Sequence, residues 1–365
     1  MGKYKLINNV LGWIVFAIAS TVYLMTMEPT ASFWDCGEFI SSAYKLEVGH
    51  PPGAPFFMLT ANLFTQLASD PSTVAKMVNT MSALFSGLTI LFLFWSITHL
   101  ARKIMVKDGE EASLGQMITI MGSGLVGALA YTFSDTFWFS AVEGEVYAYS
   151  SLFTASVFWL ILKWEAVADK PHADRWIVLI AYLMGLSIGV HLLNLLCIPA
   201  IVLVYYYKKF PNPTMKGTLA ALLVSFAIVA LMMYGVVQGL VEVCGYFELL
   251  FVNVLGMPYN SGVFAYVIIV AGVLIWSIWE TMRDEINPVR MKVAFILSIV
   301  LVGVPFIGSG YVLAVILTGA LTAYLFMSKK VNIKMLNTVL VCLMVIVVGY
   351  SSYALTMIRA TADTP

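Results

Sequence analysis

Long apolar segments recur along the whole chain and restrict its fold more than any other feature. A helix of about 20 apolar residues crosses the ~30 Å hydrocarbon core of a bilayer with its backbone hydrogen bonds satisfied internally. Charged residues make up 11% of the chain and hydrophobic residues 61%, whereas about a quarter of a soluble domain is charged. The pattern predicts an all-α polytopic membrane protein with eleven spans, at residues 7–27, 79–101, 115–138, 147–164, 176–190, 192–207, 217–240, 262–281, 291–307, 310–327 and 335–356.

Two apolar segments differ from the others in their flanking residues or in their length. The first, 7–27, follows Lys3 and Lys5 as in a signal peptide, but no small-residue cleavage site follows it, so we expect a retained helix. The second, Pro55–Ala68, has about 14 residues, too few to span, and predicts an interfacial helix.

The distribution of basic residues predicts the orientation of the chain. With the amino terminus in the cytoplasm and eleven spans, 17 of the 20 Lys and Arg residues fall in cytoplasmic segments, as the positive-inside rule requires. The remaining three are Lys45, Lys76 and Arg359. The carboxyl terminus and the first loop, 28–78, are then extracytoplasmic.

Three polar clusters are expected on this outer side. The first loop contains "FWDCGEFISSAYKLEVGHPPGAPFF", a second loop contains "SDTFWFSAVEGEVYAYSS", and the break between the fifth and sixth spans contains His191 and Asn194. Carboxylates close to a bilayer are costly and usually functional. The outer face is therefore the predicted site.

Asp35 and Glu38 are three residues apart and would share a face of a helix that begins near Phe33. We interpret at least one of them as catalytic; the alternative is a helix N-cap with its capping-box partner. His50-Pro51-Pro52-Gly53 predicts a rigid turn, because Pro51 biases His50 away from helix.

The other two clusters also have a plain structural reading. Glu143 and Glu145 could belong to a solvated loop, and His191 with Asn194 could be an intrahelical polar pair. In the functional interpretation, the two glutamates and Tyr147 bind a substrate, and His191 contacts an anionic phosphate.

A metal site is not part of the main interpretation, since neither HExxH nor paired-His spacing is present. A divalent cation held by Asp35 and Glu38 is the alternative. Cys36 and Cys244 could form one disulfide, which is a weak signal. No basic stripe with interleaved aromatics suggests nucleic-acid binding.

"WDCGEFI", "VGHPPGAP" and "EGEVYAYSS" resemble the GT-C class of polyprenyl-phosphate-sugar glycosyltransferases, in particular the bacterial branch related to protein O-mannosyltransferases. The resemblance implies that Asp35 is the catalytic carboxylate and that His50, Pro51 and Pro52 form the turn behind it. Protein O-mannosyltransferases have adjacent Asp and Glu, whereas Cys36 follows Asp35 here. It also implies that residues 1–365 form one transmembrane module, that a soluble extracytoplasmic domain follows it, and that the chain resides in the bacterial inner membrane.

The expected reaction is the transfer of a sugar, mannose by resemblance, from a polyprenyl phosphate to a Ser/Thr hydroxyl of an exported protein. A carboxylate would take the proton of the acceptor hydroxyl, and His50, His191 and Asn194 would stabilise the leaving phosphate. One such displacement inverts the anomeric centre. The alternatives are a transporter or flippase of lipid-linked sugars and a non-catalytic scaffold. Transporters usually have internal repeats, which are absent from this sequence.

Overall fold

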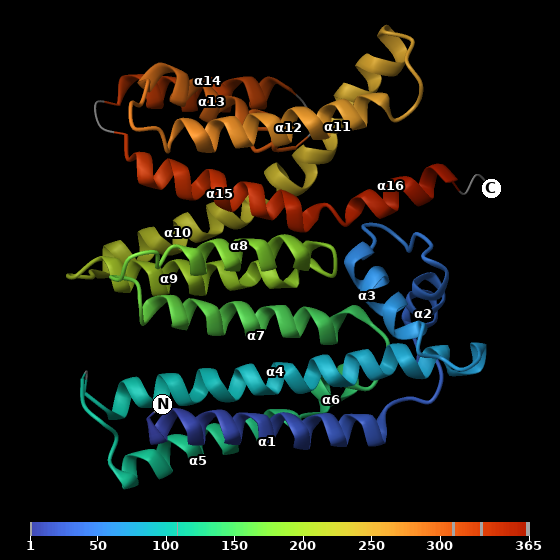
Figure 1. The fold of residues 1–365 in the computed structure, drawn as a ribbon, viewed down its shortest axis with the longest axis vertical. Coiled ribbons are helices and arrows are strands. Elements are labelled where there is room, and N and C mark those ends of the chain that lie inside the picture. The colour runs from blue at the N-terminus through green and yellow to red at the C-terminus, as the bar shows by residue number, and fades with distance from the viewer. Residues whose placement is uncertain (1, 108, 309–310, 329–330, 363–365) are drawn as a thin grey trace. The chain divides into compact units, whose positions relative to one another are not determined.

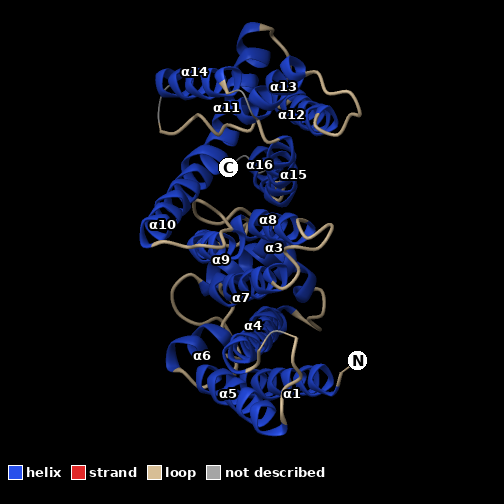
Figure 2. Ribbon diagram, turned by 90° about the vertical axis from the view of Figure 1, so that its left-hand side faces the viewer, coloured by secondary structure: helices blue, strands red, loops and turns tan. Residues whose placement is uncertain are grey.

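The computed structural model describes residues 2–107, 109–308, 311–328 and 331–362. Every regular element among these residues is helical, and Figures 1 and 2 contain no strand in the part described. Residue 310 of the tenth predicted span, Lys329 and Lys330, and the last three residues of the chain lie outside the described ranges. The all-α prediction is therefore confirmed for the described residues.

The chain divides into two compact units. Unit 1 consists of Met1–Trp176, Leu183–Cys197 and Gly349–Pro365, and unit 2 of Ile177–Tyr182 and Ile198–Val348. All residues of the predicted site belong to unit 1.

Unit 1 is built around a long central helix, α4 (Val74–Met105), which packs against α1 (Lys3–Thr26), α5 (Leu114–Thr132) and α7 (Val146–Glu165). Figure 1 shows α1, α4 and α7 side by side. Its shorter helices are α2 (Cys36–Lys45), α3 (Pro55–Thr65), α6 (Asp135–Ala141) and α16 (Tyr353–Ala362), and the 3-10 turns are η1 (Pro71–Thr73) and η2 (Leu192–Cys197). α8 (Arg175–Ile188) contributes residues to both units.

Unit 2 consists of consecutive apolar helices, and its first part is longer than expected. The elements are α9 (Ile198–Lys209), α10 (Met215–Ala230), η3 (Leu231–Val237), α11 (Gln238–Leu249), η4 (Leu250–Val254), α12 (Ser261–Glu280), α13 (Pro288–Leu301), α14 (Tyr311–Met327) and α15 (Ile333–Tyr350). Residues 215–254 are continuously helical, because one π-helical segment connects α10 to α11 and a second extends α11 to Val254. The sequence predicts a span that ends at 240.

Eight helical segments of the described residues are long and apolar enough to cross a membrane, and three further apolar helices, α3, α8 and α14, are shorter. Long apolar helices in this number agree with a polytopic membrane protein. The predicted spans 115–138, 291–307 and 335–356 are wrong at one end. The first breaks at Phe133–Ser134 before α6, the second ends with α13 at Leu301, and the third breaks at Ser351–Ser352 before α16.

Candidate functional site

An apolar core beneath the first loop holds α2 and α3 in place. Phe39, Ile40 and Ala43 form the buried face of α2, and they pack with Phe57 and Met58 of α3 and with residues of α4 and α7. Burial of side chains of this size stabilises the fold by roughly 1.5–3 kcal/mol each. The polar residues of the loop are therefore carried on a packed support.

The amino end of α3 is connected to the turn that contains His191. The first amides of a helix have no partner within the helix, and here Phe56 N and Phe57 N donate to the carbonyl of Gly189, at 2.7 and 3.2 Å. Gly189 ends α8, two residues before His191. The first loop and the 189–194 turn thus meet.

Asp35 lies at the amino end of α2, and its side chain is exposed and makes no capping hydrogen bond. The capping-box alternative is therefore wrong for this helix. Trp34, immediately before it, is 88% exposed and has φ +59°, a conformation that is rare for a bulky residue. The side chain of Asp35 is accessible from solvent.

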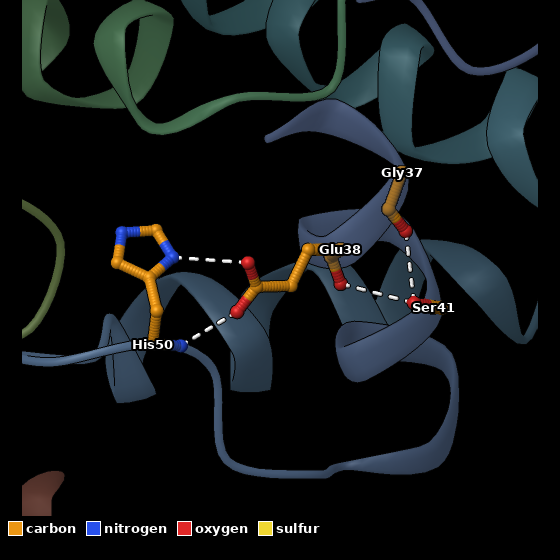
Figure 3. A network of polar contacts seen from close by, with 4 residues as sticks. All are labelled: Gly37, Glu38, Ser41 and His50. Atoms are coloured by element: carbon orange, nitrogen blue, oxygen red, sulfur yellow. Dashed lines mark hydrogen bonds and ion pairs between the residues drawn. The ribbon is translucent and has the colours of Figure 1, made fainter. Parts of the chain in front are cut away.

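Glu38 binds His50 instead of the helix end (Figure 3). One carboxylate oxygen accepts from the backbone N–H of His50 at 2.6 Å, and the other lies 3.0 Å from His50 Nδ1. These bonds from the His50 backbone and ring lower the pKa of Glu38, and the hydrogen bond and charge of Glu38 raise the pKa of His50. The pair is charged between these two pKa values.

The His-Pro-Pro-Gly segment forms the predicted turn. Gly53 N donates to His50 O at 2.8 Å, Gly53 has φ +75°, and Pro51 and Pro52 are exposed. Tyr353 Oη contacts the carbonyl oxygens of Gly53 and Ile188, at 3.3 and 3.4 Å. The turn thus lies against the α8 end and α16 within unit 1.

We expect Glu38→Gln to lower the pKa of His50 towards the ordinary value of about 6.5, because the substitution removes the negative charge beside the ring. In the wild type the ion pair is lost as the pH rises through the raised pKa of His50, or as the pH falls through the lowered pKa of Glu38. NMR titration of labelled imidazoles measures this. Glu47→Gln changes a half-buried glutamate 3.6 Å from Lys45; it is the control and should leave the titration unchanged. An unchanged midpoint in Glu38→Gln would contradict the pairing.

Glu143 and Glu145 lie in the turn between α6 and α7, where both are buried, with side chains 2% and 9% exposed. The solvated-loop alternative is therefore wrong. Burial raises the pKa of Glu143, whereas the neighbouring side chains of Ser32 and Cys36 act to lower it. Burial, together with the charges of Glu143 and Asp35, raises the pKa of Glu145 to about 7.

Hydrogen bonds draw this turn against the first loop. Glu28 N donates to Val142 O at 3.0 Å, and Asn79 of α4 donates to the carbonyl oxygens of Glu28 and Thr30, at 2.7 and 3.1 Å. Cys36, Glu143 and Glu145 present groups within 4.8 Å of one another, and so do Asp35, Glu38 and His50. The two acidic clusters predicted from the sequence are thus brought together at the amino end of α2.

His191 lies in the turn after α8, half-buried, with its ring 5.5 Å from that of Tyr147. Its Nδ1 accepts from Leu193 N at 3.1 Å, so the ring hydrogen is on Nε2. Burial lowers the pKa of His191, which leaves a neutral imidazole that can donate through Nε2–H. Tyr147 is 42% exposed.

Asn194 is fully buried and donates to Ser187 Oγ at 3.0 Å. Its side chain holds the turn, and a contact with a ligand would require the turn to open. Sequence patterns predicted neither that Cys36 neighbours Glu143 nor that Asn79 fastens the first loop. A buried asparagine in a long apolar helix was the available signal for Asn79.

Comparison with known proteins gives a partial match. A protein-family model described as "Protein O-mannosyl-transferase TMEM260 N-terminal domain" matches residues 35–214. "Protein O-mannosyl-transferase TMEM260" of Mus musculus is 28% identical over 174 residues, which cover 48% of this chain and 22% of the relative. The Dictyostelium discoideum protein of the same description is 25% identical over 187 residues, 50% of this chain and 21% of the relative. No solved structure matches the chain.

The matched part of the chain thus spans about a fifth of the length of these relatives. The match begins at Asp35 and includes every residue of the predicted site. The resemblance to protein O-mannosyltransferases is confirmed over this range. Both relatives are eukaryotic, so the expected location in a bacterial inner membrane finds no support in them.

Proposed function

We propose, from the similarity of residues 35–214 to protein O-mannosyltransferases, that this chain is the membrane module of a glycosyltransferase. It transfers a sugar, mannose in the first instance, from a polyprenyl phosphate to a Ser/Thr hydroxyl of a protein. The supporting observation is that the matched segment begins at an exposed carboxylate, Asp35, beside the Glu38–His50 pair.

In this proposal Asp35 takes the proton of the acceptor hydroxyl as its oxygen attacks the anomeric carbon. The glycosidic bond to phosphate breaks, and the leaving phosphate keeps the electron pair. The Nε2–H of His191 donates to a phosphate oxygen, and the protonated ring of His50 supplies positive charge. Stabilisation of charge that develops on a leaving group lowers the barrier, and a single displacement inverts the anomeric centre.

The test is a transfer assay with the purified chain, a panel of polyprenyl-phosphate sugars and a Ser/Thr peptide. Sugar on the peptide, released from one donor class, supports the proposal. Movement of the lipid-linked sugar across a vesicle membrane without transfer would favour the flippase alternative.

We expect His191→Ala to raise the KM for the lipid-linked donor more than the KM for the peptide, by roughly 10-fold or more, since a hydrogen bond to a charged group contributes about 1.5–3 kcal/mol. Initial rates with each substrate varied in turn measure this. Leu193→Ala, an exposed leucine in the same turn, is the control. A raised peptide KM with an unchanged donor KM would reassign His191 to the acceptor side.

We propose that the site faces the extracytoplasmic side of a multi-pass membrane protein. In a background in which Cys197, Cys244 and Cys342 are replaced by serine and the fully buried Cys36 is kept, a cysteine near Glu47 or Arg359 should react with an impermeant maleimide added from outside. A cysteine near Lys107 or Asp284 should react only after permeabilisation. The reason is the 17-to-3 partition of basic residues. Outside labelling near Lys107 would reverse the orientation.

A further inference from the structure

The cluster of Cys36, Glu143 and Glu145 lies next to the proposed base and has no role in the proposed reaction. Cys36 is fully buried, and the two glutamates are 2% and 9% exposed. Burial of carboxylates is unfavourable unless a positive charge or hydrogen-bond donors compensate for the lost water. A positive charge placed among these groups would offset this cost.

The described residues supply too few donors for these groups. The side chains of Ser32 and Cys36 favour the charged form of Glu143, whereas burial and acidic neighbours act on Glu145. The charges that act on Glu145 come from Glu143 and Asp35, both acidic. Glu145 is thus a buried carboxyl group directed at a thiol and a second carboxyl group.

A buried side-chain oxygen of α4, near the same turn, also has no hydrogen-bond partner among the described residues. Asn79 Oδ1 is buried and accepts no hydrogen bond from the residues described. It lies close to Gly144, the residue between Glu143 and Glu145 in the sequence: a Cβ atom on Gly144 would be 2.9 Å from Asn79 Oδ1. The NH₂ group of the same side chain donates to the carbonyl oxygens of Glu28 and Thr30. These two bonds fix the direction in which Oδ1 points. Acceptors collect around this turn without matching donors.

We propose that Cys36 Sγ and the carboxylates of Glu143 and Glu145 bind a divalent cation of the Zn²⁺ class. Three groups from two segments about 100 residues apart lie within 4.8 Å of one another. Zinc bonds of roughly 2.3 Å to sulfur and 2.1 Å to oxygen place ligand atoms within about 4 Å of one another, so small side-chain adjustments suffice. A sulfur ligand favours Zn²⁺ over Mg²⁺ or Ca²⁺.

Bound in this way, the cation fastens the amino end of α2 to the 142–145 turn and so positions Asp35. The S–H bond of Cys36 breaks, a metal–sulfur bond forms, and the proton leaves to solvent. Glu38 and His50 satisfy one another, which makes their cluster with Asp35 the weaker candidate for a cation.

The test uses the full chain in detergent, stripped with a chelator and titrated with Co²⁺. We expect one bound metal per chain and a thiolate-to-cobalt charge-transfer absorption. Cys36→Ser should abolish the absorption, and Glu145→Gln should weaken the apparent affinity by at least about 10–100-fold, the loss seen even for outer-shell partners. Helicity and elution volume report the folding of each variant.

Two matched variants serve as controls. Cys197→Ser removes another buried thiol of unit 1, 3.9 Å from Thr154 O, and Glu38→Gln removes a carboxylate of the exposed cluster. Both should bind Co²⁺ like the wild type. Loss of binding in Glu38→Gln but not in Cys36→Ser, or wild-type protein without the charge-transfer band, would overturn the proposal.

If Cys36→Ser does not fold, X-ray absorption of the zinc-loaded wild type keeps the proposal testable. A sulfur neighbour at roughly 2.3 Å is expected, and a shell of nitrogen and oxygen only would refute the site. Transfer activity is not a readout, so failure of the cation site is distinguishable from failure of the proposed reaction.

Discussion

Asp35→Asn is expected to reduce turnover by roughly 10²- to 10⁴-fold, the usual contribution of general-base catalysis. Asparagine keeps the shape of the side chain but cannot take the proton of the acceptor. The free energy of unfolding should barely change, because the Asp35 side chain is exposed and caps nothing. Single-turnover transfer from the lipid-linked donor measures the effect.

The matched control is Asp135→Asn, an exposed aspartate in the first turn of α6. It changes the same functional group and should leave turnover within about twofold, since surface substitutions away from a site have small effects. Loss of activity in both variants would point to a general effect of charge on the outer face.

Glu38→Gln tests whether Asp35 and not Glu38 is the general base. We expect a smaller loss than in Asp35→Asn, because Glu38 already binds His50 through both oxygens and acts by holding the His50 turn. The reverse ranking would make Glu38 the base. Near-wild-type turnover in both variants would transfer the catalytic assignment to Glu143 or Glu145.

The second large expected effect concerns unit 2. Gly303→Ala should lower the free energy of unfolding by about 3 kcal/mol, because overpacking alone typically costs 1–3 kcal/mol and a non-glycine residue is strained at positive φ. Gly303 has φ +88°, and a Cβ atom there would lie 2.1 Å from the carbonyl carbon of Gly239. Backbone meets backbone at this point, so no side chain can move aside.

Denaturant titration of purified variants measures this loss. Gly272→Ala in α12 is the control, because nothing lies within 4 Å of its Cβ position, and alanine favours a helix over glycine by about 1 kcal/mol. A Gly303→Ala variant as stable as the wild type would contradict the close approach of α11 to the segment after α13.

Several features of this protein follow from the sequence by itself. The free energy of moving a segment from water into a membrane depends on the composition of that segment. Runs of apolar residues therefore predicted where the helices lie, including the short helix Pro55–Thr65. The His-Pro-Pro-Gly turn also followed locally, from the restriction that a proline places on the residue before it. The motif beginning at Asp35 indicated the family resemblance.

Tertiary structure alone decided which polar groups meet. The spacing of Asp35 and Glu38 allowed a capping box, but Glu38 binds His50 because the turn brings a backbone N–H and a ring nitrogen to it. Likewise, Cys36 is adjacent to Asp35 in sequence yet faces Glu143 and Glu145. A polar group forms a hydrogen bond or ion pair with the group that the packed helices bring within about 3 Å of it. The position of α2 depends on its contacts with α3, α4 and α7, and local composition does not specify these contacts.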